Sequence, residues 1–166
     1  MAETDLRKVT DRLRRLCSRR EYCMSDILKK AITALDGDRD AAAKVLDVLV
    51  SEKYVDDLRY ATAYAREKAM IAGWGETKIR YMLSAKHIDR SLVDQALTEI
   101  DYSKADSRLQ KLLENKAKTL RKDPQAHLKL IRFALGRGYK YDDVAKLITS
   151  LTTYTSLTSL KFLTQV

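Results

Sequence analysis

Adjacent aspartates are the side chains of this sequence whose type and spacing come nearest to a catalytic arrangement. Asp56-Asp57 and Asp142-Asp143 each place two carboxylates together, as acid–base catalysis can require. Both pairs stand where a helix is expected to begin, and there an aspartate side chain accepts backbone N–H groups. The sequence shows no nucleophile and base at a spacing typical of a catalytic pair. We therefore interpret the aspartates as helix caps and predict that the protein is not an enzyme.

The thiols and imidazoles do not form a metal or redox pattern. Cys17 and Cys23 are six residues apart, which matches neither a zinc motif nor a Cys-x-x-Cys redox motif. His87 and His127 have no thiol or carboxylate at ligand spacing. We expect two reduced thiols, as in a reducing compartment, and neither a metal nor a cofactor.

The glycines of Gly73-Trp74-Gly75 could be compared with a phosphate-binding loop. A P-loop, however, needs Gly-x-x-x-x-Gly-Lys-Ser/Thr after a strand, and helical patterns flank these glycines. The segment is therefore predicted to be a turn that ends one helix, with Trp74 packed on its neighbours.

Composition favours a helical protein with an anionic partner. The 166 residues are 45% hydrophobic and include only 5 Gly and 1 Pro, which leaves little turn chemistry for a sheet protein. The formal charge is +9, which favours a nucleic acid or an acidic protein as partner. Because there is no long apolar run and the N-terminus is charged, we expect no membrane segment and no secretory signal. The predicted location is the cytoplasm.

A helical unit is repeated along the chain. The segment Lys78–Ile88 resembles Leu130–Tyr139, and each is an amphipathic helix followed by a sharp turn and a second apolar helix. The predicted fold is all-α, with three tandem three-helix repeats forming an elongated, curved helical array. The predicted bounds are 1–56, 57–101 and 102–151, followed by a poorly specified Thr- and Ser-rich tail, 152–166.

Helix boundaries are predicted from capping residues and breakers. The predicted helix starts are Ser25-Asp26, Asp38, Asp57 and Asp123-Pro124. Gly73 and Gly75 are expected to form the turn around Trp74, and Gly136 and Gly138 to supply left-handed backbone.

Basic side chains are the candidate contacts with a partner. Their repeated placement on corresponding helices marks several of them, and the full predicted set is Arg15, Arg19, Arg20, Arg59, Arg66, Lys78, Arg80, Lys86, Arg132, Arg137 and Lys140. Reversing the charges of Arg132 and Arg137 together is expected to weaken partner binding without unfolding the chain. Two other interpretations stay open: a helix-turn-helix DNA binder using residues 78–100, and a helical-repeat scaffold for another protein.

Several of these segments together resemble the RecX family of recombination regulators. They are Cys17–Tyr22, Tyr54–Ala61, Gly73-Trp74-Gly75, Lys86-His87-Ile88 and Arg137-Gly138-Tyr139. The resemblance covers residues 8–151, and Asp57-x-Arg-x-Ala61 is its most specific element.

The resemblance implies a partner, the RecA recombinase filament. It implies a protein that lodges in the helical groove of that filament, contacts successive protomers, and lowers ATP hydrolysis, strand exchange and filament growth. The predicted basic residues would then contact the filament, and weak direct contact with single- or double-stranded DNA is a further expectation. We expect the regulator to be a monomer.

Overall fold

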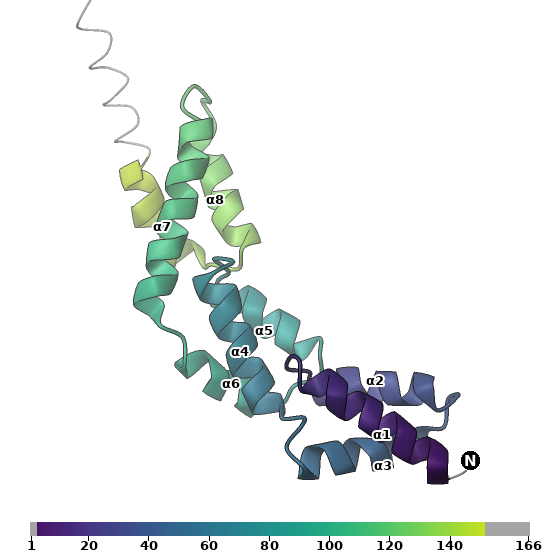
Figure 1. Cartoon of the computed structure of the whole chain (residues 1–166). Helices are drawn as coiled ribbons and strands as arrows, with labels where there is room; N and C mark the ends of the chain where they lie inside the picture. Colours follow the sequence, from purple (N-terminus) through teal and green to yellow (C-terminus); the bar gives the residue numbers. More distant parts are fainter. Residues whose placement is uncertain (1–2, 152–166) are drawn as a thin grey trace, which may run out of the picture. The chain divides into compact units, whose positions relative to one another are not determined.

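The computed structural model describes residues 3–151, so the predicted Thr- and Ser-rich tail, 152–166, lies outside the described residues. Over the described part of the chain the backbone forms nine helical segments and no strand, which confirms the all-α prediction. The helices are α1 (Glu3–Cys17), α2 (Met24–Ala34), α3 (Arg39–Ser51), α4 (Asp57–Met70), α5 (Glu76–Ser84), α6 (Arg90–Thr98), α7 (Tyr102–Thr119) and α8 (Ala126–Gly136), followed by a helical segment over 141–151 (Figure 1).

The chain forms two compact units that do not follow one another along the sequence. The first contains the described residues up to Ala65 together with Met82–Glu99. The second contains Arg66–Tyr81 and the described residues from Ile100 onward. Helices α4 and α5 therefore each contribute to both units. The three-repeat bounds remain a prediction.

In the first unit α1, α2 and α3 pack against one another in all three pairings. Apolar residues at three- and four-residue spacing give each helix one buried face. The core side chains with almost no exposure include Leu13 from α1, Ile27 and Ala31 from α2, and Leu49 from α3. Asp38 accepts a hydrogen bond from the Ala41 amide at 2.9 Å, which confirms the predicted cap of α3.

The second unit has its own core between α7, α8 and the helical segment over 141–151. Leu113 of α7 and Leu130 of α8 are fully buried, and Val144 and Ile148 of the last segment join them. The predicted start of α8 at Asp123-Pro124 is wrong. Asp123 instead closes a turn by accepting the Gln125 amide at 2.8 Å, and α8 begins at Ala126.

The predicted cap of α2 at Ser25-Asp26 is also wrong, because this helix begins at Met24, one residue before Ser25. Cys23 occupies the cap position and its side chain makes no capping hydrogen bond. The carboxylate of Asp57 instead accepts the amide of Met24, the first residue of α2, at 2.7 Å. The prediction that Asp57 caps α4 is therefore wrong. That role falls to Asp56, whose side chain accepts the Arg59 amide at 2.9 Å.

Candidate functional site

A basic groove lies between α1 and α2 in the first unit. Its volume is about 580 Å³ and five of its eight lining residues are Lys or Arg, whereas none is acidic. The lining residues, which define the α1–α2 groove, are Arg12, Leu13, Arg15, Leu16, Arg19, Lys29, Lys30 and Thr33. Two predicted contact residues, Arg15 and Arg19, therefore lie in one concave site.

Helical spacing explains how one wall of the α1–α2 groove collects its arginines. Arg12, Arg15 and Arg19 are separated by three and four residues, so they fall on one face of the helix and of the turn that continues it. The turn is held by a hydrogen bond from the Arg19 amide to the Leu16 carbonyl at 3.2 Å. Leu13 of the same helix is 1% exposed and anchors α1 to the core. The groove thus has an apolar floor beneath its cationic rim.

Another arginine of α1 shows what distinguishes the groove residues. Arg14 donates to Glu52 through Nε at 2.7 Å and to Asp11 through Nη1 at 2.6 Å. These hydrogen bonds, that of Glu52 first, raise the pKa of the Arg14 guanidinium above its ordinary value. Among the described residues Arg12, Arg15 and Arg19 have no such acidic partner. Their charge therefore remains available to a ligand.

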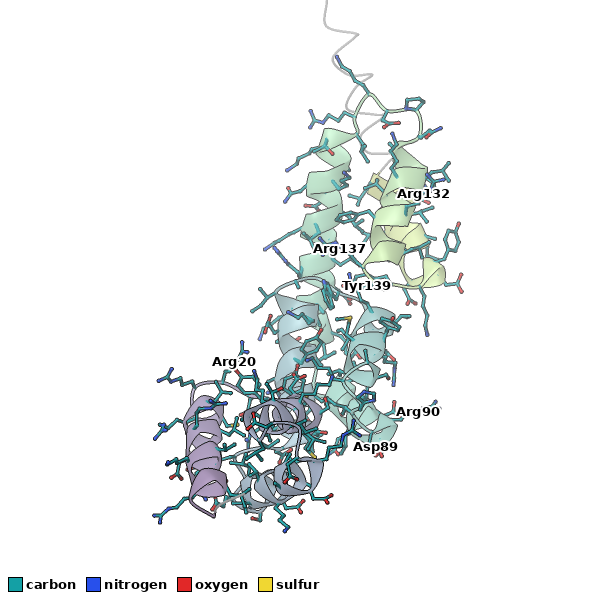
Figure 2. The ribbon with its side chains drawn as sticks, turned by 90° about the vertical axis from the view of Figure 1, so that its right-hand side faces the viewer. Arg20, Asp89, Arg90, Arg132, Arg137 and Tyr139 are labelled. Atoms are coloured by element: carbon teal, nitrogen blue, oxygen red, sulfur yellow. The ribbon has the colours of Figure 1, made fainter. Side chains whose placement is uncertain are left out.

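The Arg20 and Lys30 side chains both lie against the ring of Tyr22. The Arg20 guanidinium carbon lies 4.5 Å from the centroid of the Tyr22 ring, and Lys30 Nζ lies 5.7 Å from it. Tyr22 itself is 7% exposed, so the ring is part of the core and is not a platform for stacking a base. The cation–π contacts hold two long side chains in place without neutralising them. Figure 2 marks the position of Arg20.

Two predicted contact residues of the first unit are already paired within the fold. Lys86 Nζ donates to Asp26 Oδ2 at 2.6 Å, and the Lys86 carbonyl accepts the hydroxyl of Ser25 at 2.7 Å. Arg59 Nε donates to Glu21 Oε1 at 2.7 Å, and its Nη2 also donates to a backbone carbonyl at 3.1 Å. Because both cations already have carboxylate partners, they are poorer candidates for a ligand than the groove residues.

Arg137 has a similar structural role in the second unit. Its Nη1 donates to the Ala72 carbonyl at 2.6 Å, and its guanidinium carbon lies 4.6 Å from the centroid of the Phe133 ring. Figure 2 labels Arg137 and Arg132, which is exposed on α8. Charge reversal at Arg137 would remove this hydrogen bond, because a carboxylate cannot donate to the Ala72 carbonyl, so the expectation that the reversed pair stays folded remains a prediction.

The remaining predicted contacts also divide into residues that interact within the fold and residues that are exposed to solvent. Lys78 Nζ lies 4.3 Å from the centroid of the Trp74 ring, and Arg80 pairs with Glu76 at 2.7 Å. Arg66 is exposed on α4 and Lys140 is exposed after α8. Arg132 and Lys140 are thus the predicted residues of the second unit that are solvent-exposed and form no ion pair among the described residues.

The Gly73-Trp74-Gly75 turn is held against a second glycine turn. The Gly75 amide donates to the Arg137 carbonyl at 2.7 Å, and a Cβ added to Gly75 would lie 2.3 Å from the Gly138 carbonyl oxygen. Gly73 and Gly138 have φ values of +66° and +89°, as a left-handed turn requires. The prediction of left-handed backbone at Gly136 is wrong, because this residue is the last of α8. The Nζ atoms of Lys68 and Lys78 lie 5.4 Å and 4.3 Å from the centroid of the Trp74 ring.

Sequence reasoning missed Arg12, Lys29, Lys30 and Thr33 as parts of a site. The signal was present in the Lys29-Lys30 pair, yet the pairing of α2 with α1 could not be read from either helix alone.

Over the part of the chain that is described, no cluster of His, Cys, Asp and Glu could hold a metal. Burial, the largest influence, raises the pKa of both Cys17 and Cys23, which makes their thiols less reactive. No helix over 3–151 is both long and apolar enough to span a bilayer.

A helix-turn-helix protein contacts DNA bases through side chains at the start of its second helix. The start of α6 is poorly suited to that role. Asp89 caps this helix and accepts both the amide and the hydroxyl of Ser91 at 3.0 Å. The Arg90 side chain extends away from the ribbon beside Asp89 (Figure 2). With the Ser91 hydroxyl already bound and Asp94 exposed on the next turn, an acidic charge would face the DNA bases.

Comparison with known proteins identifies the family. The family model described as "RecX, second three-helix domain" matches residues 56–97. A protein of Vibrio parahaemolyticus named regulatory protein RecX is 32% identical over 133 residues, which cover 78% of this chain and 83% of that protein. The chain belongs to the RecX family. This confirms the family resemblance seen in the sequence.

Other RecX proteins match a smaller share of their own length. The regulatory protein RecX of Clostridium tetani is 31% identical over 118 residues, and the chain spans only 54% of it. Two RecX crystal structures share the fold. One has a TM-score of 0.76 at 24% identity, covering 88% of this chain and 72% of its own. The other, from Lactobacillus salivarius, has a TM-score of 0.74 at 21% identity, covering 94% and 99%. The relatives from Vibrio and Clostridium are named as regulatory proteins, not as enzymes.

Proposed function

We propose that this RecX protein binds filaments of the RecA recombinase on DNA and inhibits them by occupying the filament groove. The observation that carries the proposal is the similarity to a protein named regulatory protein RecX over 83% of that protein's length. Inhibition by occupancy would lower ATP hydrolysis, strand exchange and filament extension. It needs no catalytic group of the regulator and no cofactor.

The charge distribution of the described residues supports a partner that contains DNA. The formal charge is +9, and the cations of the α1–α2 groove together with Arg132 and Lys140 face solvent without an acidic partner among the described residues. A basic surface attracts an assembly that carries phosphates, and the attraction raises the rate of encounter. The same proposal places a monomeric regulator in the cytoplasm beside the recombinase.

The test is DNA-dependent ATP hydrolysis by the cognate RecA on single-stranded DNA, with this chain added well below one molecule per protomer. We expect hydrolysis to fall at these low ratios, because one bound regulator interrupts a filament of many protomers. Full hydrolysis at saturating regulator would refute the proposal. It would favour the remaining alternative, a helical scaffold for an unrelated protein.

A matched pair of variants locates the contact in the second unit. Arg132→Glu/Lys140→Glu and Lys118→Glu/Lys122→Glu change the charge equally, and all four side chains are exposed. We expect the first variant to need about ten-fold more protein for half inhibition, a change of about 1.4 kcal/mol in binding. The second should behave as the parent does. Equal effects would remove Arg132 and Lys140 from the interface.

A further inference from the structure

We propose that the α1–α2 groove binds the phosphate backbone of a single DNA strand. The inference rests on the proposed function for its setting, a nucleoprotein filament, and adds the place at which the regulator touches DNA. It starts from three features of the groove: five cations, no lining carboxylate, and an apolar floor. The ligand that matches them is a chain of anions joined by less polar units.

Charge complementarity argues first for an anionic ligand. The acidic residues nearest in sequence to the groove are occupied by other cations, since Asp11 pairs with Arg14, Glu21 with Arg59 and Asp26 with Lys86. None of the groove cations forms an ion pair within the described residues, although the Asp26 carboxylate interacts electrostatically with Lys29. Such an arrangement is repulsive until an anion enters, so a polyanion is bound and counterions are released.

Spacing argues for a repeating anion along α1. Arg12 and Arg15 lie on α1 and Arg19 lies in the turn that follows it, so this wall extends over at most about 10.5 Å, the rise of seven helical residues. The rise of roughly 3.4 Å per phosphate holds for a strand within a duplex, and an extended single strand is longer per nucleotide, so this wall spans fewer than three nucleotides. A planar guanidinium can donate two parallel hydrogen bonds to one phosphate, and three of the five groove cations are arginines.

The shape of the groove favours one strand over a duplex. The groove is a concavity of about 580 Å³ lined by α1, the turn after it and α2, whereas a duplex carries its two backbones across a major groove about 12 Å wide. The floor offers the Leu16 and Thr33 side chains to the sugars that link the phosphates, above the buried Leu13. A basic groove that follows the backbone is the usual way in which proteins bind single strands without reading sequence.

The experiment is fluorescence anisotropy of the full chain with a fluorescein-labelled oligothymidine, over a series of NaCl concentrations and with no recombinase present. Each phosphate neutralised contributes about 0.7 to the slope of log K against log salt. For the variant Arg12→Gln/Arg15→Gln/Arg19→Gln we expect the slope to shrink by about 2 and the affinity at low salt to fall at least ten-fold. Lys29→Gln/Lys30→Gln, on the opposite wall, should weaken binding in the same direction.

Two further variants serve as controls. Lys111→Gln/Lys118→Gln/Lys122→Gln removes the same charge from exposed positions of α7 and the turn after it, and should leave affinity within about two-fold. Arg12→Lys/Arg15→Lys/Arg19→Lys keeps the charge and should retain the salt slope. Thermal unfolding followed by circular dichroism checks that each variant is folded, and Lys29→Gln/Lys30→Gln tests the groove independently if the arginine variant unfolds.

Four results would overturn the inference: no salt-dependent binding, equal loss in the α7 control, duplex bound as tightly as the single strand, or a poly-glutamate competitor as effective as DNA. Inhibition of RecA is measured separately with the same variants. A groove variant that no longer binds free DNA but still inhibits RecA would leave the proposed function standing. Retained binding of free DNA with no inhibition by the parent chain would refute only the filament proposal.

Discussion

The ammonium group of Lys86 lies 2.6 Å from a carboxylate oxygen of Asp26, 60 residues away in the sequence. The Lys86 carbonyl also accepts the Ser25 hydroxyl, so the loop after α5 is fixed at two points to the start of α2. The hydrogen bond to Asp26, the largest influence, raises the pKa of Lys86 above its ordinary value of 10.5. Burial raises the pKa of Asp26, but the hydrogen bonds from Lys86 and Cys23 lower it by more, so that the pKa lies below its ordinary value of 3.8.

Asp26→Asn should lower the free energy of unfolding at pH 7 by about 1 to 2 kcal/mol, because a partly buried charged hydrogen bond is lost. The pair's stabilisation depends on both charges. A carboxylate whose pKa is lower in the folded state contributes above 3.8 and loses that contribution as the pH falls below it. An amine whose pKa is raised contributes below 10.5 and loses it as the pH rises above that value.

Urea unfolding of the parent and of Asp26→Asn from pH 2.5 to 11.5 tests this pair. The stability difference between them should be widest between pH 5 and pH 9 and should narrow toward both extremes. A difference that does not vary with pH would mean that the ion pair contributes nothing to the fold. Lys44→Gln, which removes an exposed charge from α3, is the control.

Asp57 should respond differently to substitution by Asn and by Ala. Burial, the largest influence, raises the pKa of Asp57 above 3.8, so the folded state disfavours its charge although the carboxylate accepts the Met24 amide. Asn keeps an acceptor and removes the charge, so Asp57→Asn should keep or raise stability at pH 7, whereas Asp57→Ala should lose about 1 kcal/mol.

The pH dependence of Asp57 has the opposite sign to that of Asp26. Because its pKa is raised on folding, the parent loses stability as the pH rises from below 3.8 through the folded value. Any advantage of Asp57→Asn should therefore disappear when unfolding is measured near pH 3. Greater damage from Asn than from Ala at pH 7 would contradict this account.

Arg137 and Arg132 should separate a structural role from a role in binding. Arg137→Ala removes the hydrogen bond to the Ala72 carbonyl and the contact with the Phe133 ring, and should cost about 2 kcal/mol of unfolding free energy. Arg132→Ala is an exposed substitution and should change stability by less than about 0.5 kcal/mol. Chemical denaturation of both variants makes the comparison, and equal stability would show that Arg137 is not structural.

The two glycines that flank Arg137 provide a second matched pair. Gly138 has φ +89°, and a Cβ there would lie 2.4 Å from Lys78 Cβ, so Gly138→Ala should cost at least about 2 kcal/mol. A Cβ at Gly136 would meet nothing within 4 Å, and this residue ends α8 with helical backbone. Gly136→Ala should therefore be neutral or stabilising by up to about 1 kcal/mol. Thermal melting in which the two variants behaved alike would contradict the turn geometry.

The local pattern of the sequence predicted the helices well, because apolar spacing and caps act over a few residues. The cap at Asp38 and the left-handed turn at Gly138 follow from side-chain and backbone chemistry that each segment carries by itself. The segments around Asp57 and Gly73-Trp74-Gly75 likewise pointed to the family without any knowledge of contacts.

The tertiary structure alone decided which polar side chains serve the fold and which face solvent. A lysine on an amphipathic helix has the same local signature whether it pairs with a distant carboxylate, as Lys86 does with Asp26, or lines an open groove, as Lys30 does. Asp57 was expected to cap its own helix, yet its carboxylate accepts an amide of α2. Partners far apart in sequence are brought together by burial of the core, and no periodicity within one helix records which ones will meet.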